Sequence, residues 1–219
     1  TICPTFTNIH ELSKSENLID KEELSRRAIK MLFKFKENVI YEPPFIHLAK
    51  LHQVYEYDVE EEIGHWLDFT SKFAKGHSIR SSKANEFRQQ IENTRKDLIE
   101  ISDSFNEEAK KIRQRILNKK DHKKLDTYQI TGEFLEFFVQ KSTNNICDLN
   151  GFEMNKAELL IKTLDHFFKT LETSRMKIQA NDWYDFATLA YVQPGDKYWT
   201  REKRWINLIK DADCEEYLY

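Results

Sequence analysis

The stretch from Asn181 to Trp205 constrains the fold of this chain more than any other, because two helix signals flank a short extended segment. Asp182 and Asp185 follow Asn181, a favourable helix-capping residue, and their spacing of three places both acids on one face of the first helical turn. A Pro-Gly pair then ends the helical pattern, and residues 197–200 are predicted to form a short strand. The next helix follows, with Thr200 as its expected cap. Helix, strand and helix in succession are typical of a parallel α/β layer.

The composition favours helices around a small sheet. The chain has 219 residues, enough for one domain or for one domain with an insertion. Only five Gly and four Pro, with 32% charged residues, argue against an all-β fold with many tight turns. The net charge of −3 provides no overall attraction to nucleic acid, so any such binding must come from a local basic surface.

The cysteines and the hydropathy exclude several classes of protein. Cys3, Cys147 and Cys214 are far apart and form no CxxC pair, so neither a zinc site nor a disulfide framework is predicted. We therefore expect reduced thiols and a cytoplasmic protein. No apolar run approaches the roughly 18–20 residues that a membrane span needs, and no membrane partner is expected.

A long helix is predicted over residues 82–118, where apolar residues recur at spacings of three and four along one narrow seam. Its expected partner is a helix over residues 125–141. Together they are predicted to form a helical hairpin inserted into an α/β core, with the core in residues 1–57 and 146–219 and the insertion in residues 58–145. The same seam is a candidate surface for a homo-oligomer.

Several acids could together hold a divalent cation. Mg²⁺ is bound by carboxylate oxygens and keeps most of its waters, so a few acids at the ends of separate elements suffice. Asp182, Asp185 and Glu202 meet this need in the C-terminal stretch. Glu11 is a further candidate, although Asn8 with Glu11 three residues later is also a helix-capping pattern that needs no metal.

These residues resemble a known family. Asn181-Asp182-Trp183-Tyr184-Asp185, then Thr200-Arg201-Glu202, a helix over 205–212 and a short strand over 216–219, is similar to the C-terminal half of PIN-like nucleases. Residues 7–12 resemble the family's segment with a Glu-Leu pair. The family also uses an Asp at the end of its first strand, which we expect upstream of Thr1. The resemblance implies a PIN-like parallel sheet flanked by helices.

The function implied by this resemblance is metal-dependent hydrolysis of phosphodiester bonds, by an endoribonuclease acting on RNA in preference to DNA. Asp185, Glu202, Asp182 and Glu11 would hold Mg²⁺ or Mn²⁺, which activates water without a histidine base. A glutamate at position 202, where aspartate is commoner in the family, lengthens the side chain. The expected setting is a toxin or a phage-defence effector, with a protein partner that inhibits or activates it.

The predicted substrate-binding residues are mostly basic. Thr200 could orient a carboxylate or a water, and the cations beside it could receive backbone phosphates. A second basic segment is either a phosphate-binding surface or a solvated helix end, which the helix dipole also favours. The residues are Thr200, Arg201, Lys203, Arg204, Lys119, Lys120, Lys123 and Lys124.

Two alternatives remain open. The chain could be a non-catalytic interaction module with a PIN-like scaffold, in which case the carboxylates would be too dispersed to bind metal. It could instead be a helical oligomerisation protein, in which case helices would occur without a parallel sheet.

Overall fold

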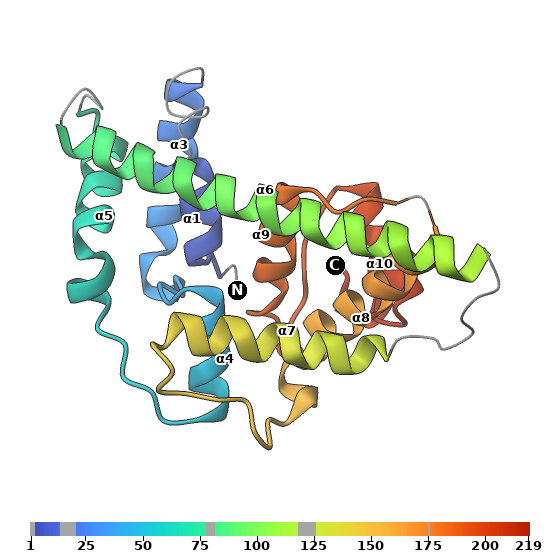
Figure 1. Cartoon of the computed structure of the whole chain (residues 1–219). Helices are drawn as coiled ribbons and strands as arrows, with labels where there is room; N and C mark the ends of the chain where they lie inside the picture. The colour runs from blue at the N-terminus through green and yellow to red at the C-terminus, as the bar shows by residue number, and fades with distance from the viewer. Residues whose placement is uncertain (1–2, 14–20, 78–81, 118–125, 175) are drawn as a thin grey trace. The chain divides into compact units, whose positions relative to one another are not determined.

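The described residues are mostly helical (Figure 1). The structure is a computed structural model and describes residues 3–13, 21–77, 82–117, 126–174 and 176–219. The α-helices are α1 (Phe6–Leu12), α3 (Glu22–Leu32), α4 (Pro44–His52), α5 (Val59–Ala74), α6 (Ser82–Leu117), α7 (Thr127–Ser142), α8 (Glu158–Thr173), α9 (Ala180–Leu189) and α10 (Lys203–Asp211), and the 3₁₀ helices are η1 (Phe33–Asn38), η2 (Met154–Ala157) and η3 (Glu215–Tyr217).

The prediction of a PIN-like parallel sheet is wrong for the part of the chain that the structure describes. Within those residues there is no strand, and extended segments meet only in two isolated parallel bridges, Thr5 with Ile40 and Tyr198 with Leu218. The second bridge joins residues 197–200 and 216–219, two segments that were predicted to be short strands. A sheet requires several neighbouring strands that share hydrogen bonds over several residues, and these short segments each pair at a single point.

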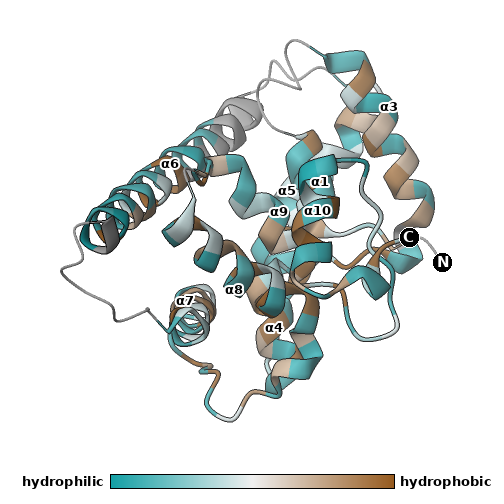
Figure 2. Cartoon of the chain, turned by 90° about the vertical axis from the view of Figure 1, so that its right-hand side faces the viewer, coloured by the Kyte–Doolittle hydropathy of each residue, from teal (hydrophilic) through white to brown (hydrophobic). Residues whose placement is uncertain are grey.

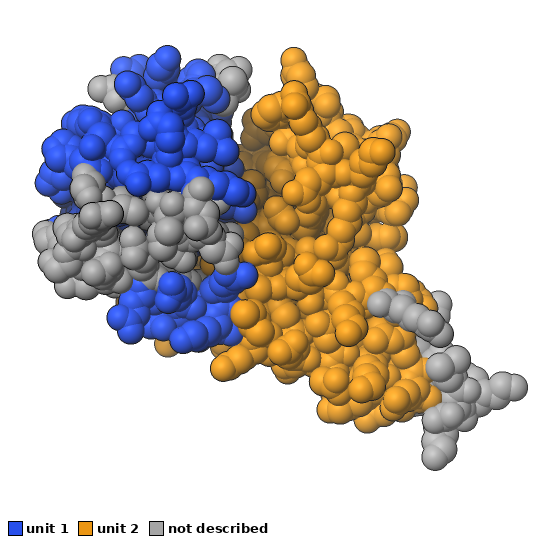
Figure 3. Space-filling view, turned by 90° about the horizontal axis from the view of Figure 1, so that it is seen from above, with its two compact units in different colours: residues 1–44, 56–97 blue, residues 45–55, 98–219 orange. Residues whose placement is uncertain are grey.

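The chain divides into two compact units, which are coloured separately in Figure 3. Unit 1 comprises residues 1–44 and 56–97, and unit 2 comprises residues 45–55 and 98–219. The predicted division into a sheet core and a helical insertion stays a prediction.

Unit 1 is held by α1, α3 and α5 around a small apolar cluster. Ile29 of α3 and Phe73 of α5 are buried in this cluster. The guanidinium of Arg26 lies 4.6 Å from the centre of the Phe73 ring and donates a hydrogen bond to the Phe73 carbonyl. At the start of α5, the Asp58 carboxylate accepts hydrogen bonds from the Glu60 and Glu61 amides. The Arg26 contacts hold α5 against α3, and the Asp58 cap stabilises the start of α5.

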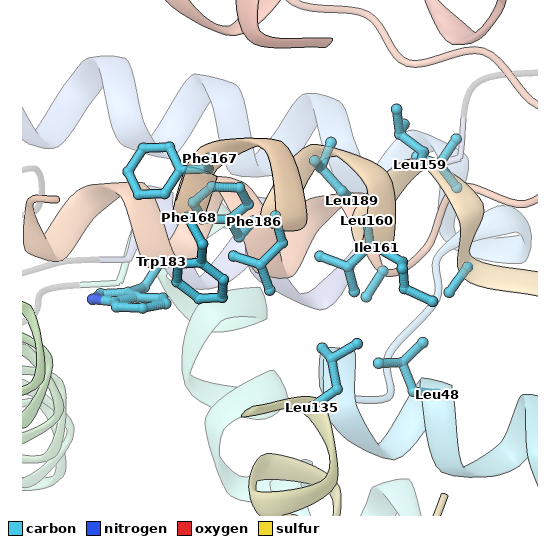
Figure 4. Close-up of a cluster of buried hydrophobic side chains, with 14 of the residues drawn as sticks. Leu48, Leu135, Leu159, Leu160, Ile161, Phe167, Phe168, Trp183, Phe186 and Leu189 are labelled. Atoms are coloured by element: carbon cyan, nitrogen blue, oxygen red, sulfur yellow. The ribbon is translucent and has the colours of Figure 1, made fainter. Parts of the chain in front are cut away.

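Unit 2 is organised around α8, which packs against α7, α9 and α10. Apolar residues cover most of its circumference, so the helix is buried on nearly all sides. Figure 4 shows Phe167 and Phe168 of α8 near Trp183 and Phe186 of α9. α4, which is largely hydrophobic in Figure 2, adds Leu48 to the same cluster.

The long helix α6 confirms the predicted helix over residues 82–118. Its C-terminal half belongs to unit 2, where Phe105 stacks on Phe168 and meets the edge of Trp183. The indole N–H of Trp183 donates to the Ser102 hydroxyl at 2.9 Å. In this half, therefore, the apolar seam packs on the core of its own chain.

A polar cluster joins the start of α8 to η3. Lys162 Nζ lies 2.5 Å from Glu158 Oε1, and the Tyr217 hydroxyl donates to Glu158 Oε2 at 2.8 Å. These two hydrogen bonds, that from Lys162 first, lower the pKa of Glu158. Burial raises the pKa of the neighbouring Cys214 thiol to about 11, so this thiol is held in its neutral form.

Glu158→Gln should lower the free energy of unfolding at neutral pH by about 0.5–1 kcal/mol, since the ion pair is partly exposed. The pKa of Glu158 is lowered by folding, so its contribution is present above the ordinary value of 4.5 and is lost as the pH falls through the folded value. Urea denaturation at neutral pH and at about pH 3 should show the difference shrinking in acid. Glu153→Gln, at a more exposed ion pair with Lys156, is the control. If Glu158→Gln lowered the free energy of unfolding equally at both pH values, the lowered pKa of Glu158 would be contradicted.

Across the described ranges, no helix combines the length and the apolar composition needed to cross a membrane.

Candidate functional site

An ion pair joins the first turns of α9 and α10. Arg204 donates from Nη1 to Asp182 Oδ1 at 2.7 Å and from Nη2 to Asp182 Oδ2 at 3.0 Å. The Asp182 side chain is 5% exposed, whereas that of Arg204 is 42% exposed. Asp182 Oδ2 also accepts a hydrogen bond from the amide of Gln179, the residue that caps α9. A bidentate pair of this kind fixes both distance and orientation between the two helices.

An apolar contact one turn further continues this junction. Phe186 lies four residues after Asp182 on the same face of α9, and its ring meets the edge of Trp205 at a centroid distance of 4.9 Å. Trp205 follows Arg204 directly and is 2% exposed. The start of α10 is therefore held against α9 by one polar and one aromatic contact.

Asp185 and Glu202 lie beside this junction. Asp185 is half-buried and lies three residues after Asp182, so it occupies the flank of the α9 face that meets α10. Glu202 is exposed, caps α10 and precedes Arg204 by two residues. The packing of unit 2 thus joins the starts of the two helices on which these acids stand, through the pair of Asp182 and Arg204.

The segment that leads into α10 carries exposed basic side chains. The Glu202 amide donates to the Thr200 hydroxyl at 3.2 Å, so Thr200 supports the backbone of the capping residue. Arg201 and Lys203 are exposed. The Arg201 guanidinium lies 5.4 Å from the centre of the Trp199 ring. The positive end of the α10 dipole adds to the potential of these side chains and favours a phosphate there.

The other predicted site residues are Glu11 and four lysines. Glu11 is exposed in the last turn of α1 and belongs to unit 1. The predicted capping pair of Asn8 and Glu11 is wrong, because Asn8 instead accepts a hydrogen bond from the Thr5 amide at 2.9 Å. Lys119, Lys120, Lys123 and Lys124 lie outside the described residues.

The sequence also misplaced two helix caps. Asn181 was expected to cap the first helix, but Gln179 does so and Asp182 occupies the third helical position. Thr200 was expected to cap the second helix, but Glu202 does so. Both shifts are small, and both change the role of an acid, because Asp182 points back to its own capping residue and Glu202 becomes a cap.

Two of the three C-terminal acids stay candidates for a metal site. Among the described residues, no group of three or more His, Cys, Asp or Glu side chains is arranged to hold a metal ion. Both oxygens of Asp182 already accept hydrogen bonds from Arg204 and Gln179, which suits a structural role. Asp185 and Glu202 supply carboxylates from the starts of α9 and α10, and Mg²⁺ can be bound by one or two carboxylates with several waters and substrate phosphates.

A surface pocket of about 400 Å³ lies apart from these acids, between α7 and the loop that follows it. Glu136, which lines it, accepts hydrogen bonds from Gln140 and from the Leu149 amide. Its carboxylate therefore anchors the loop to α7, and the pocket contains none of the predicted site residues.

Sequence reasoning missed the partner of Asp182. Arg204 was expected to bind substrate phosphate, and the structure engages it with Asp182 instead. No pattern along the chain signals a pair separated by 22 positions.

Comparisons of the chain with protein-family models, with curated proteins and with solved structures found no match.

Proposed function

We propose that this chain is a metal-dependent nuclease that hydrolyses RNA at the α9–α10 junction, where Asp185 and Glu202 hold Mg²⁺ or Mn²⁺. The observation that carries the proposal is the ion pair of Asp182 with Arg204, because it ties together the two helix starts that bear these acids. When bound, the cation would supply an activated water and would offset charge on the phosphate. Asp185 and Glu202 would position the cation. The pair of Asp182 with Arg204 positions the two helix starts that bear these carboxylates.

The charges around the junction support a phosphodiester substrate. Arg201 and Lys203 are exposed beside Glu202, and each can contact a backbone phosphate without reading the base. Such contacts provide sequence-independent affinity although the whole chain carries a net charge of −3. A role as a cytoplasmic toxin or phage-defence effector with a regulatory protein partner remains part of the proposal.

A second candidate is a non-catalytic module that binds nucleic acid through the same surface. It is favoured by the engagement of both Asp182 oxygens and by the lack, among the residues the structure describes, of a group of three metal-binding side chains. Oligomerisation through α6 has less support, because Leu98, Ile101 and Phe105 pack against the core of unit 2.

Incubation of the purified chain with labelled RNA and DNA separates the two candidates. The nuclease proposal expects cleavage of RNA with Mn²⁺ or Mg²⁺ and none with a chelator, since the water nucleophile depends on the cation. Restoring the cation after chelation should restore cleavage. Binding without cleavage under every metal condition would support the non-catalytic module and reject the nuclease.

A further inference from the structure

Two large aromatic side chains face outward next to the proposed site. The parallel bridge of Tyr198 with Leu218 is closed by hydrogen bonds from the Tyr198 amide to the Tyr217 carbonyl at 2.7 Å and from the Tyr219 amide to the Tyr198 carbonyl at 3.2 Å. In this register, Trp199 lies opposite Tyr219. Successive side chains of an extended segment alternate between faces, so Trp199 and Tyr219 share the face opposite Tyr198 and Leu218.

The two faces differ in burial as this alternation requires. Tyr198 and Leu218 pack against the core of unit 2. Trp199 is 67% exposed and Tyr219 is 93% exposed. The other tryptophans, Trp66, Trp183 and Trp205, are 8%, 6% and 2% exposed.

Three basic residues lie within four positions of Trp199 along the chain. Arg201 places its guanidinium over the Trp199 ring, and Lys203 is exposed two residues later. Lys197 is anchored by a hydrogen bond to the Glu216 carbonyl, which places its charge at the same bridge. Aromatic rings interleaved with Lys and Arg are the combination with which proteins bind single strands, because bases stack on the rings while the cations contact phosphates. A duplex keeps its bases stacked inside and cannot use such rings.

We infer that the face formed by Trp199, Tyr219, Arg201 and Lys203 binds single-stranded nucleic acid by base stacking. The inference rests on the proposed function, since it names the form of nucleic acid that the site takes. The bases of the strand would stack against Trp199 and Tyr219. Its phosphate backbone would contact Arg201 and Lys203. Arg201 also holds the indole in place, which lowers the entropy lost when a base stacks on it.

Binding measured in chelator tests this inference without cleavage. A short labelled oligouridylate should bind more tightly than a duplex of the same length and should quench tryptophan emission, of which the exposed Trp199 is the accessible source. Trp199→Leu should abolish the quenching and weaken binding about tenfold. Phe137→Leu, at an aromatic residue on α7 that is 56% exposed, should bind like the unchanged chain. Arg201→Gln should reduce the salt dependence of log K by about 0.7.

The inference would be overturned if Trp199→Leu bound the oligouridylate as tightly as the unchanged chain, or if the duplex bound more tightly than the single strand. It would also be overturned if polyglutamate quenched the emission as strongly as the oligouridylate and competed with it. That result would indicate an acidic polypeptide as the partner. Melting curves establish that the variants are folded. If the chain binds the single strand but does not cleave it in the presence of Mg²⁺ or Mn²⁺, the proposed nuclease function is rejected and the binding inference stands. Cleavage with single-strand binding independent of Trp199 would reject this inference alone.

Discussion

Asp185→Asn is expected to reduce metal-dependent cleavage of RNA by about 100-fold or more, a loss of roughly 2.7 kcal/mol of transition-state stabilisation. The amide keeps the size of the side chain and removes the negative charge that would hold the cation. Initial rates at saturating Mn²⁺, with melting curves for both proteins, provide the measurement.

Glu202→Gln should have a similar effect on the cleavage rate, because the proposed site has only two carboxylates. The matched control is Asp211→Asn, which neutralises an exposed acid at the other end of α10. Its rate should stay within about twofold of the unchanged chain, since a distant exposed charge is largely screened. If Asp185→Asn and Asp211→Asn cleave equally well, the two-carboxylate site is wrong.

Helices could be predicted from this sequence because their signals are local. The seam along α6 and the apolar spacing of α8 each repeat over several turns, and both helices formed where the repeat occurs. The fold class could not be predicted in the same way. Residues 197–200 are extended as expected, whereas Glu216 and Tyr217 belong to the 3₁₀ helix η3, so only the end of the predicted strand over 216–219 is extended. Whether such segments build a sheet depends on neighbours that local sequence does not specify.

In the candidate site, too, the local features could be predicted and the long-range contacts could not. Spacing correctly placed Asp182 and Asp185 within one turn of a helix, because that depends only on helical geometry. Which of the two acids would be buried and paired depends on how α10 packs on α9. The burial of Trp205 brings Arg204 to Asp182, and this long-range contact converts a predicted metal ligand and a predicted phosphate-binding residue into partners of each other.

The two halves of this ion pair are expected to contribute unequally to stability. Arg204→Met should cost about 2–3 kcal/mol, because among the described residues the buried Asp182 carboxylate would then keep only its hydrogen bond from the Gln179 amide, at 2.8 Å. This value is below the range for fully buried pairs, since Arg204 is 42% exposed. Asp182→Asn should cost about 1 kcal/mol, because the amide can still accept from Gln179 and the released Arg204 can reach water.

Urea denaturation of both single variants and of the double variant measures the coupling. The double variant should be more stable than Arg204→Met, since it no longer buries an unpaired charge. Lys203→Met, which removes an exposed cation from the same turn of α10, should change stability by less than about 0.5 kcal/mol. Equal costs for Arg204→Met and Lys203→Met would mean that Asp182 has no need of its partner. In that case Arg204 would be available to bind phosphate, and Asp182 would be available as a third metal ligand.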